Sequence, residues 1–163
     1  MRRALLAALL LAWPALQLAA QDNNNTPGRE HDPITMVEAQ DPEMNAAIAQ
    51  AQATLPEWLA LLADPPEGSG GFAFKFPLEG FEHIWVGGVT RNGDVLSGRL
   101  ANVPMLEGWQ QGDRVEVPLS EVSDWAWWDA DGKAHGYRTV AVLMQRMPPA
   151  QAEQLRRGFG WEE

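Results

Sequence analysis

Apolar residues recur every three or four positions between residues 41 and 64, which is the spacing of one face of an α-helix. The segment opens with Asp41-Pro42-Glu43, which offers an N-cap residue, a proline at the first helical position and an acidic first turn. We predict an amphipathic helix that starts after Asp41, and we expect Pro56 to kink or split it. The apolar stripe comprises Met44, Ile48, Ala51, Leu55, Leu59 and Leu62.

Alternation of apolar and polar residues replaces the helical period after the glycine-rich segment 68–71. A period of two is typical of half-buried strands. The dipeptide Asn92-Gly93 tolerates positive φ at both of its positions and separates two of these segments, so we expect them to pair as a hairpin. The five predicted strands are residues 72–76, 81–90, 95–100, 114–119 and 124–128.

The segment 137–147 is compatible with two kinds of element. Its first seven residues alternate as in a strand, whereas its apolar residues also recur at helical spacing. We favour the helix, which the prolines at 148 and 149 would end, and we expect one more short helix at 150–157 before a tail at 159–163. The residues that fit the helix are Val140, Leu143, Met144 and Met147.

Together these patterns predict an α+β fold. An N-terminal amphipathic helix packs on a mostly antiparallel sheet of about five strands, and a C-terminal helix or helices follow. A segment of this length can bury enough apolar surface to fold alone, so we assign residues 41–158 to a single domain.

The amino terminus has the order of a secretory signal peptide. Arg2 and Arg3 precede an apolar run at 4–13, and small residues stand just before Gln21. A membrane anchor needs about 20 apolar residues, and Pro14 interrupts this run early. We therefore expect a signal peptide at 1–20, a flexible leader at 21–40, a periplasmic or secreted product, and no membrane span once the signal is removed.

The charge and the cysteine content limit the partners and the means of stabilisation. The chain holds 12 Lys and Arg against 22 Asp and Glu, and its formal net charge is −10. Removal of residues 1–20 takes away two arginines and leaves −12. Such a field repels phosphate backbones, so we expect no nucleic-acid partner. The chain has no cysteine and so cannot form a disulfide, and we expect an apolar core to stabilise the exported protein.

Catalytic chemistry has only weak candidates, which are His83, Asp124 and Glu82. A carboxylate next to an imidazole resembles a general acid/base pair, but adjacent residues of a strand point to opposite faces. Asp124 could instead reach His83 across the sheet. We lean against an enzyme.

Metal and cofactor chemistry has less support. The three histidines, His31, His83 and His135, are widely spaced, whereas zinc sites usually draw on closely spaced ligand pairs. Asp129-Ala130-Asp131-Gly132 reads better as a turn than as a calcium loop. We expect no metal site and no cofactor.

Binding is the more credible activity. Trp109, Trp127 and Trp128, flanked by Asp124, could form an aromatic platform rimmed by carboxylates, suited to a sugar ring or to a protein partner. Asn102 completes the candidate binding residues. The alternative is that these rings only build the core of a small sheet, with Trp128 or Trp109 partly exposed.

Several separated motifs resemble one known family. The chain is similar to the bacterial domain of unknown function typified by YegJ, over about residues 34–147. The resemblance implies a small α+β domain that is often exported, and it transfers no catalytic residues. Its motifs are Asp41-Pro42-Glu43-Met44-Asn45, Glu82-His83-Ile84-Trp85-Val86, Leu100-Ala101-Asn102-Val103-Pro104, Gly112-Asp113 and Ser123-Asp124-Trp125.

Two hypotheses about function follow. The first is a non-catalytic periplasmic interaction module that binds an unknown protein or an envelope glycan through the sheet edge near Trp109 and residues 124–128. The second is a cell-envelope enzyme that uses His83 with Asp124 or Glu82 as acid and base. The first requires no catalytic constellation, so we prefer it.

Overall fold

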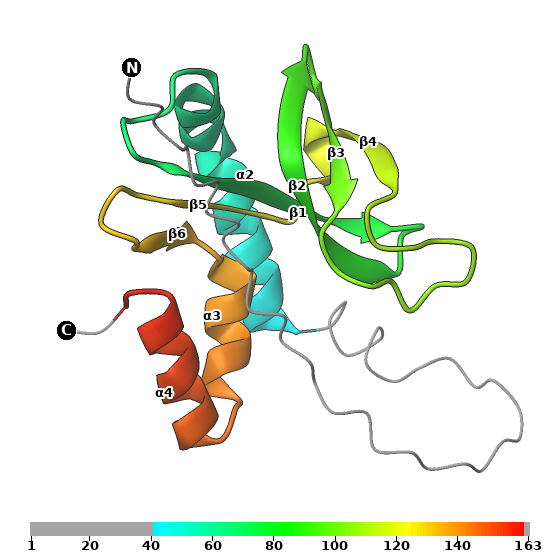
Figure 1. Cartoon of the computed structure of the whole chain (residues 1–163). Coiled ribbons are helices and arrows are strands. Elements are labelled where there is room, and N and C mark those ends of the chain that lie inside the picture. The colour runs from blue at the N-terminus through cyan, green and yellow to red at the C-terminus, as the bar shows by residue number, and fades with distance from the viewer. Residues whose placement is uncertain (1–40, 162–163) are drawn as a thin grey trace, which may run out of the picture. The chain divides into compact units, whose positions relative to one another are not determined.

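The computed structural model of the chain describes residues 41–161 (Figure 1). The predicted signal peptide at 1–20 and the predicted leader at 21–40 lie outside the described residues.

The fold class is α+β, as predicted, and its centre is a six-stranded sheet in the order β4-β3-β2-β1-β5-β6. Every neighbouring pair of strands is antiparallel. The sheet has one strand more than the five expected. The strand that was not predicted follows the turn at 129–133, and its three residues are too few to show an alternating pattern. The strands are β1 (Gly70–Leu78), β2 (Glu82–Asn92), β3 (Val95–Leu100), β4 (Arg114–Pro118), β5 (Asp124–Trp128) and β6 (Ala134–Gly136).

The predicted hairpin joins β2 to β3, but its turn is displaced by one residue. Asn92 pairs with Val95, so the two central residues are Gly93 and Asp94 instead of Asn92 and Gly93. Gly93 has φ +59°, a conformation that costs glycine little because it lacks a Cβ. Asn92 thus remains in the ladder and extends the pairing of the two strands.

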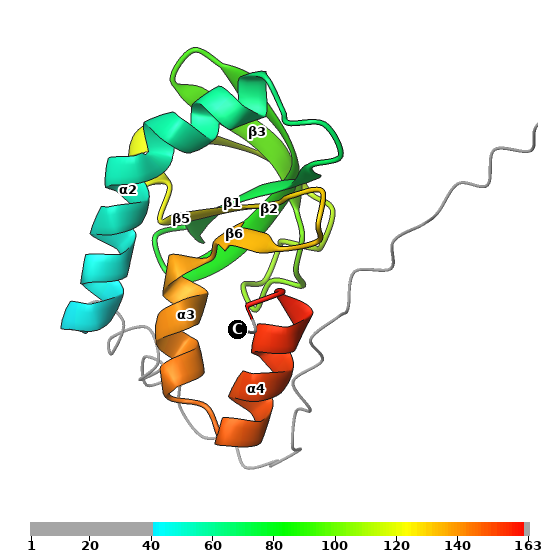
Figure 2. The same ribbon diagram turned by 90° about the vertical axis from the view of Figure 1, so that its left-hand side faces the viewer.

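The helix α2 (Pro42–Ala63) follows Asp41 directly. Asp41 caps it, since its Oδ1 accepts hydrogen bonds from the backbone N–H groups of Glu43 (3.1 Å) and Met44 (3.3 Å). Pro56 lies inside the helix without splitting it, so of the two effects that we expected the split does not occur, and the helix bends along its length (Figure 2). A proline removes one N–H donor from a helix, and the packing of the apolar face on the sheet holds the two halves together.

Two tryptophans fasten α2 to β5. The Trp58 Nε1–H donates to the backbone oxygen of Ala126 (3.1 Å), and the Trp125 Nε1–H donates to that of Ala51 (3.0 Å). The two indoles stack with their centroids 6.4 Å apart. Both rings are buried among the apolar residues that α2 and one face of β1 to β5 contribute. This contact closes the main core of the described region.

The segment 137–147 forms a helix and not a strand, because α3 (Arg138–Gln145) occupies it. The helix α4 (Pro149–Gly158) follows, and the two lie side by side below the strands (Figure 2). Arg146, just after α3, forms ion pairs with Asp41 and with Glu43, so this end of α3 is joined to the start of α2. The guanidinium group lowers the pKa of Asp41 to about 2.

The packed region extends to Trp161, beyond the boundary predicted at residue 158. The Ala134 N–H donates to the Phe159 oxygen (2.9 Å), and the Trp161 Nε1–H donates to the Ala134 oxygen (2.7 Å). Phe159 stacks on Tyr137 with a centroid distance of 4.6 Å. These residues cover the outer edge of β6, and the sequence offers no periodic pattern there that would predict it.

We predict that Trp58→Ala lowers the free energy of unfolding by about 3–5 kcal/mol, because it removes a large buried ring and leaves a cavity. Trp58→Phe should cost less, because it keeps an aromatic ring and loses chiefly the hydrogen bond to Ala126. Denaturant titration measures both. The control Glu57→Ala, at the exposed neighbouring position, should stay within about 0.5 kcal/mol of the parent chain. A Trp58→Ala chain as stable as the parent would contradict this account of the core.

Candidate functional site

The predicted tryptophan platform does not form, because Trp127 and Trp128 are consecutive residues of β5 and face opposite sides of the sheet. Trp127 stacks on Phe72 (5.9 Å between centroids) and on His135 (4.4 Å). Trp128 meets the rings of Tyr137 and Phe159 edge to face. Both indoles therefore already have aromatic neighbours within the protein.

Asp124 cannot be part of a carboxylate rim, because it is fully buried. Its oxygens accept hydrogen bonds from the backbone N–H groups of Trp125 (2.9 Å), Arg138 (3.2 Å) and Thr139 (2.8 Å), and from the Thr139 hydroxyl (2.7 Å). Tyr137, at the N-cap of α3, provides no side-chain cap. Asp124 therefore caps α3 from the neighbouring strand. Burial raises its pKa, and these hydrogen bonds oppose that shift.

Two cationic side chains, the buried Lys75 and the half-buried Arg138, lie near Asp124. Lys75 is paired with Asp124 in the register of β1 and β5, and its Nζ donates to the Thr139 hydroxyl (3.4 Å). The guanidinium group of Arg138 lies 4.3 Å from the ring centroid of Trp125, and its Nη1 is buried without a hydrogen-bond partner. This cluster connects β1, β5 and the start of α3.

The three catalytic candidates have separate surroundings. His83 Nδ1 is 2.9 Å from the hydroxyl oxygen of Ser123, a buried residue. Glu82 Oε2 accepts the backbone N–H groups of Met105 (2.9 Å) and Leu106 (3.3 Å). Both carboxylates thus hold backbone segments in place, Glu82 at the loop between β3 and β4 and Asp124 at α3. The acid/base pairing of His83 with either one stays a hypothesis.

No group of three or more potential metal-ligating side chains gathers within residues 41–161. In the same part of the chain, no helix has both the length and the apolar character to cross a membrane.

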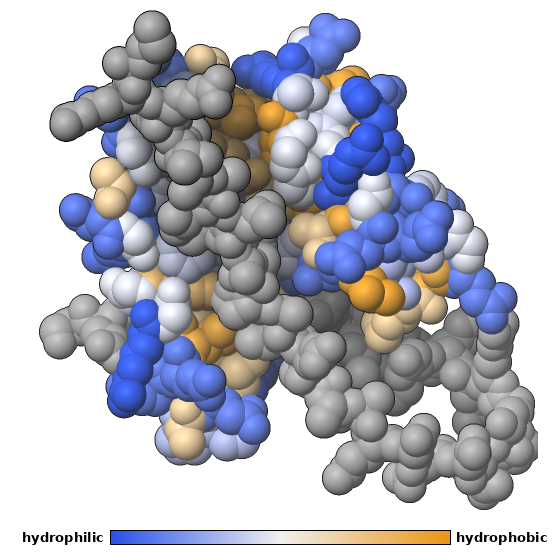
Figure 3. All heavy atoms as spheres, in the orientation of Figure 1, coloured by the Kyte–Doolittle hydropathy of each residue, from blue (hydrophilic) through white to orange (hydrophobic). Residues whose placement is uncertain are grey.

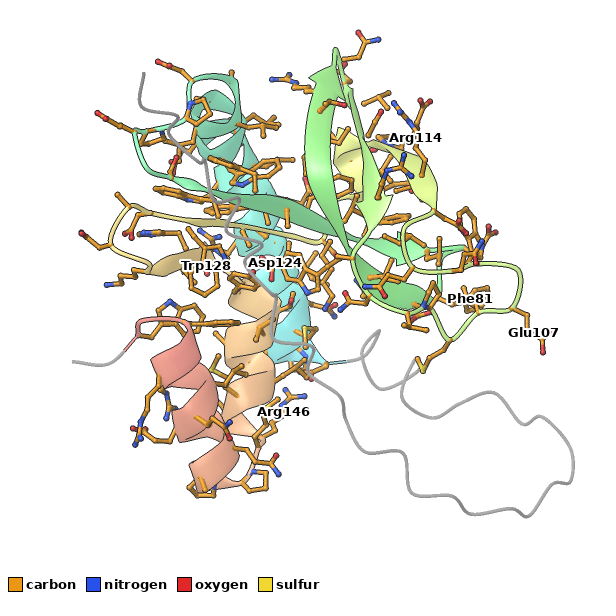
Figure 4. All side chains as sticks on the ribbon, viewed as in Figure 1. Phe81, Glu107, Arg114, Asp124, Trp128 and Arg146 are labelled. Atoms are coloured by element: carbon orange, nitrogen blue, oxygen red, sulfur yellow. The ribbon has the colours of Figure 1, made fainter. Side chains whose placement is uncertain are left out.

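The large apolar side chains most exposed in the described region lie at one end of the sheet. Phe81 is 58% exposed, Val103 74% and Met105 77%. Phe81 belongs to the turn between β1 and β2, and the other two belong to the loop 101–113 between β3 and β4. Figure 3 shows apolar atoms among hydrophilic ones at this end, and Figure 4 shows Phe81 beside the loop that carries Glu107. We call Phe81, Val103 and Met105 the loop patch.

Hydrogen bonds fix the loop that carries most of the patch. Besides the contacts of Glu82, the Ala101 N–H donates to the Trp85 oxygen (2.8 Å), and the Gln111 side chain donates to the Ala101 oxygen (2.7 Å). Asp113 Oδ2 accepts the Gln110 N–H (2.9 Å). The patch is therefore displayed on an ordered loop.

Two of the predicted binding residues lie in this same loop. Asn102 is exposed, whereas Trp109 is half-buried and packs against the main core. Val103 and Met105 were not predicted as candidate site residues because neither belongs to a periodic segment, and Phe81 was predicted to lie in a strand. One feature of the sequence could have indicated exposed apolar side chains here. Two apolar residues flank Pro104, and a proline at this point means that the segment must leave the sheet.

We predict that Asp124→Ala lowers the free energy of unfolding by about 2–4 kcal/mol, because it leaves several buried donors without an acceptor. Asp131→Ala is the matched control, since this carboxylate is exposed on the turn before β6. Thermal unfolding at neutral pH compares the two variants. Equal midpoints for both variants would mean that Asp124 does not support the fold.

Comparison with known proteins agrees with the bacterial family of unknown function that the sequence motifs indicate. No curated protein and no solved structure matches this chain. The model of DUF2314, described as an uncharacterized protein conserved in bacteria, matches residues 41–162. The match covers most of the chain and the whole described region. The chain therefore belongs to DUF2314, a family of uncharacterized bacterial proteins.

Proposed function

We propose that this chain is an exported, non-catalytic interaction module that binds another protein of the bacterial cell envelope through the loop patch. The observation that carries the proposal is the exposure of Phe81, Val103 and Met105 at one end of the sheet. Water-exposed apolar side chains that gather in one place are a common feature of interaction sites.

The order of the loop favours binding as well. A surface that is already held in one conformation loses less conformational entropy when a partner docks. The hydrogen bonds that the backbone N–H groups of Met105 and Leu106 donate to Glu82 hold the patch in this way.

A protein partner has more support than an envelope glycan. Sugar rings stack on open aromatic faces, and Trp127 and Trp128 are in contact with the rings of other residues. Trp109 packs against the core. The patch offers instead one phenyl ring and two aliphatic side chains, which suit apolar side chains of a protein.

The alternative is a cell-envelope enzyme that uses His83 with Asp124 or Glu82. The hydrogen bond between His83 and Ser123 favours it, but Ser123 is buried, and both carboxylates accept hydrogen bonds from backbone donors. Turnover of an envelope substrate that is lost in His83→Gln, with stability unchanged, would support the enzyme over the module.

Within the family, we propose that the chain belongs with the YegJ-like proteins. The motifs around residues 82–86, 100–104 and 123–125 support this finer assignment.

Export is testable by itself. On expression in a bacterium, we expect the protein in the periplasmic fraction or the medium with Gln21 as its first residue, because the segment before it has the order of a signal peptide. Cell fractionation and intact mass measure both. A chain that lacks residues 2–20 is the control and should stay in the cytoplasm. An uncleaved full-length chain in the cytoplasm would contradict the proposal.

Binding through the loop patch is tested by crosslinking and capture from living cells. We expect the combined variant Phe81→Ala, Val103→Ala and Met105→Ala to capture at least about tenfold less of its main partner, because these side chains would be the anchors of the contact. The three side chains are exposed, so the variant should fold, and circular dichroism checks this. Glu57→Ala is the control. Undiminished capture by the folded triple variant would overturn the proposal.

A further inference from the structure

We propose that the partner of the loop patch is a protein segment in which apolar anchors are flanked by Lys or Arg side chains. The inference rests on the function proposed above and adds the chemistry of the partner. It derives from the charges of the two chain segments that carry the patch.

These two segments, residues 79–82 and 101–113, hold carboxylates and no Lys or Arg. Glu79 and Glu107 are exposed, and Glu107 points away from the sheet at the loop (Figure 4). Glu82 and Asp113 are half-buried and bind backbone N–H groups of the loop, which leaves their negative charge at its base. The apolar surface is therefore bordered by up to four negative charges.

Two cationic groups of the described region lie at the base of the loop, one on β3 and one on β4. Arg99 Nη1 donates to the Gly112 oxygen (2.9 Å), and Arg99 pairs with Arg114 in the register of β3 and β4. In the described region, two guanidinium groups, those of Arg99 and Arg114, stand against four carboxylates, so the charge at the border of the patch stays negative. The whole chain adds to this field, since its formal net charge is −10.

This field disfavours two other occupants. A second copy of the chain would bring the same negative border to the contact, and like charges brought together cost free energy. Anionic lipid headgroups would be repelled for the same reason. A cationic segment gains from both features, since the apolar anchors supply affinity and the charges raise the association rate and the specificity.

The test is an array of synthetic 12-residue peptides that carry two apolar anchors at every spacing, in basic, neutral and acidic series. The chain is used as it is isolated from the expressing cells. We expect binding mainly in the basic series, and we expect the association rate to fall at least about tenfold between low and high salt, because salt screens exposed charges.

Variants separate the two kinds of contribution. A double variant with Glu79→Gln and Glu107→Gln should slow association of the basic peptides. The control double variant, Glu57→Gln with Glu67→Gln, removes two exposed charges from α2 and the turn after it, and it should change the association rate little. Phe81→Ala with Met105→Ala should speed dissociation. Binding that depends on Phe81 and Met105 but is equal in all three series would overturn the cationic partner and leave the proposed function standing.

Other results would also overturn the inference. One such result is that no peptide of the basic series binds. Another is a concentration-dependent dimer that the combined Phe81→Ala, Val103→Ala and Met105→Ala variant does not form. The third is binding to phosphatidylglycerol vesicles that this combined variant loses. Sedimentation of the chain alone and flotation with vesicles report the last two. If the dimer or the vesicles account for all the patch dependence, the protein-partner function fails as well.

Discussion

The described part of this protein depends on the contact between α2 and β5, in which Trp58 and Trp125 each donate to the backbone of the opposite element. An indole brings a large apolar surface and one N–H donor, and a buried donor without an acceptor is costly. The two hydrogen bonds therefore fix where along β5 the helix lies. The apolar face of the sheet can then be closed without a disulfide.

The opposite side of β5 shows how polar groups can stabilise a small domain. Asp124 connects the strand to the start of α3, and Lys75 reaches Thr139 in the same cluster. Buried groups of this kind often mark catalytic sites, but they also occur where a helix end needs an acceptor. The number of backbone donors around Asp124 supports the second role. The large apolar side chains that are most exposed to solvent in the described region lie elsewhere, in the loop patch.

The sequence predicted the fold class and most strands because the period of two and the period of 3.6 are strong where one face of an element is buried. It missed β6, which is too short for a period, and it placed the Gly93 turn one residue early. The candidate site was harder to predict. Trp127 and Trp128 look like one cluster in the sequence, but the pleat sends them to opposite faces, and the conformation that exposes Met105 depends on Glu82, a distant residue.

The residues after α4 have a consequence for association between chains. The backbone oxygen of Phe159 accepts a hydrogen bond from the Ala134 N–H, and the Trp161 indole donates one to the Ala134 oxygen. The outer edge of β6 is therefore occupied by the protein's own backbone and an indole. The other outer strand, β4, carries Arg114 and Glu116 and ends at Pro118, which has no N–H to offer. Charges and proline on an edge strand discourage edge-to-edge pairing. Both borders of the sheet therefore resist templated aggregation, the addition of a strand from another chain to an open edge.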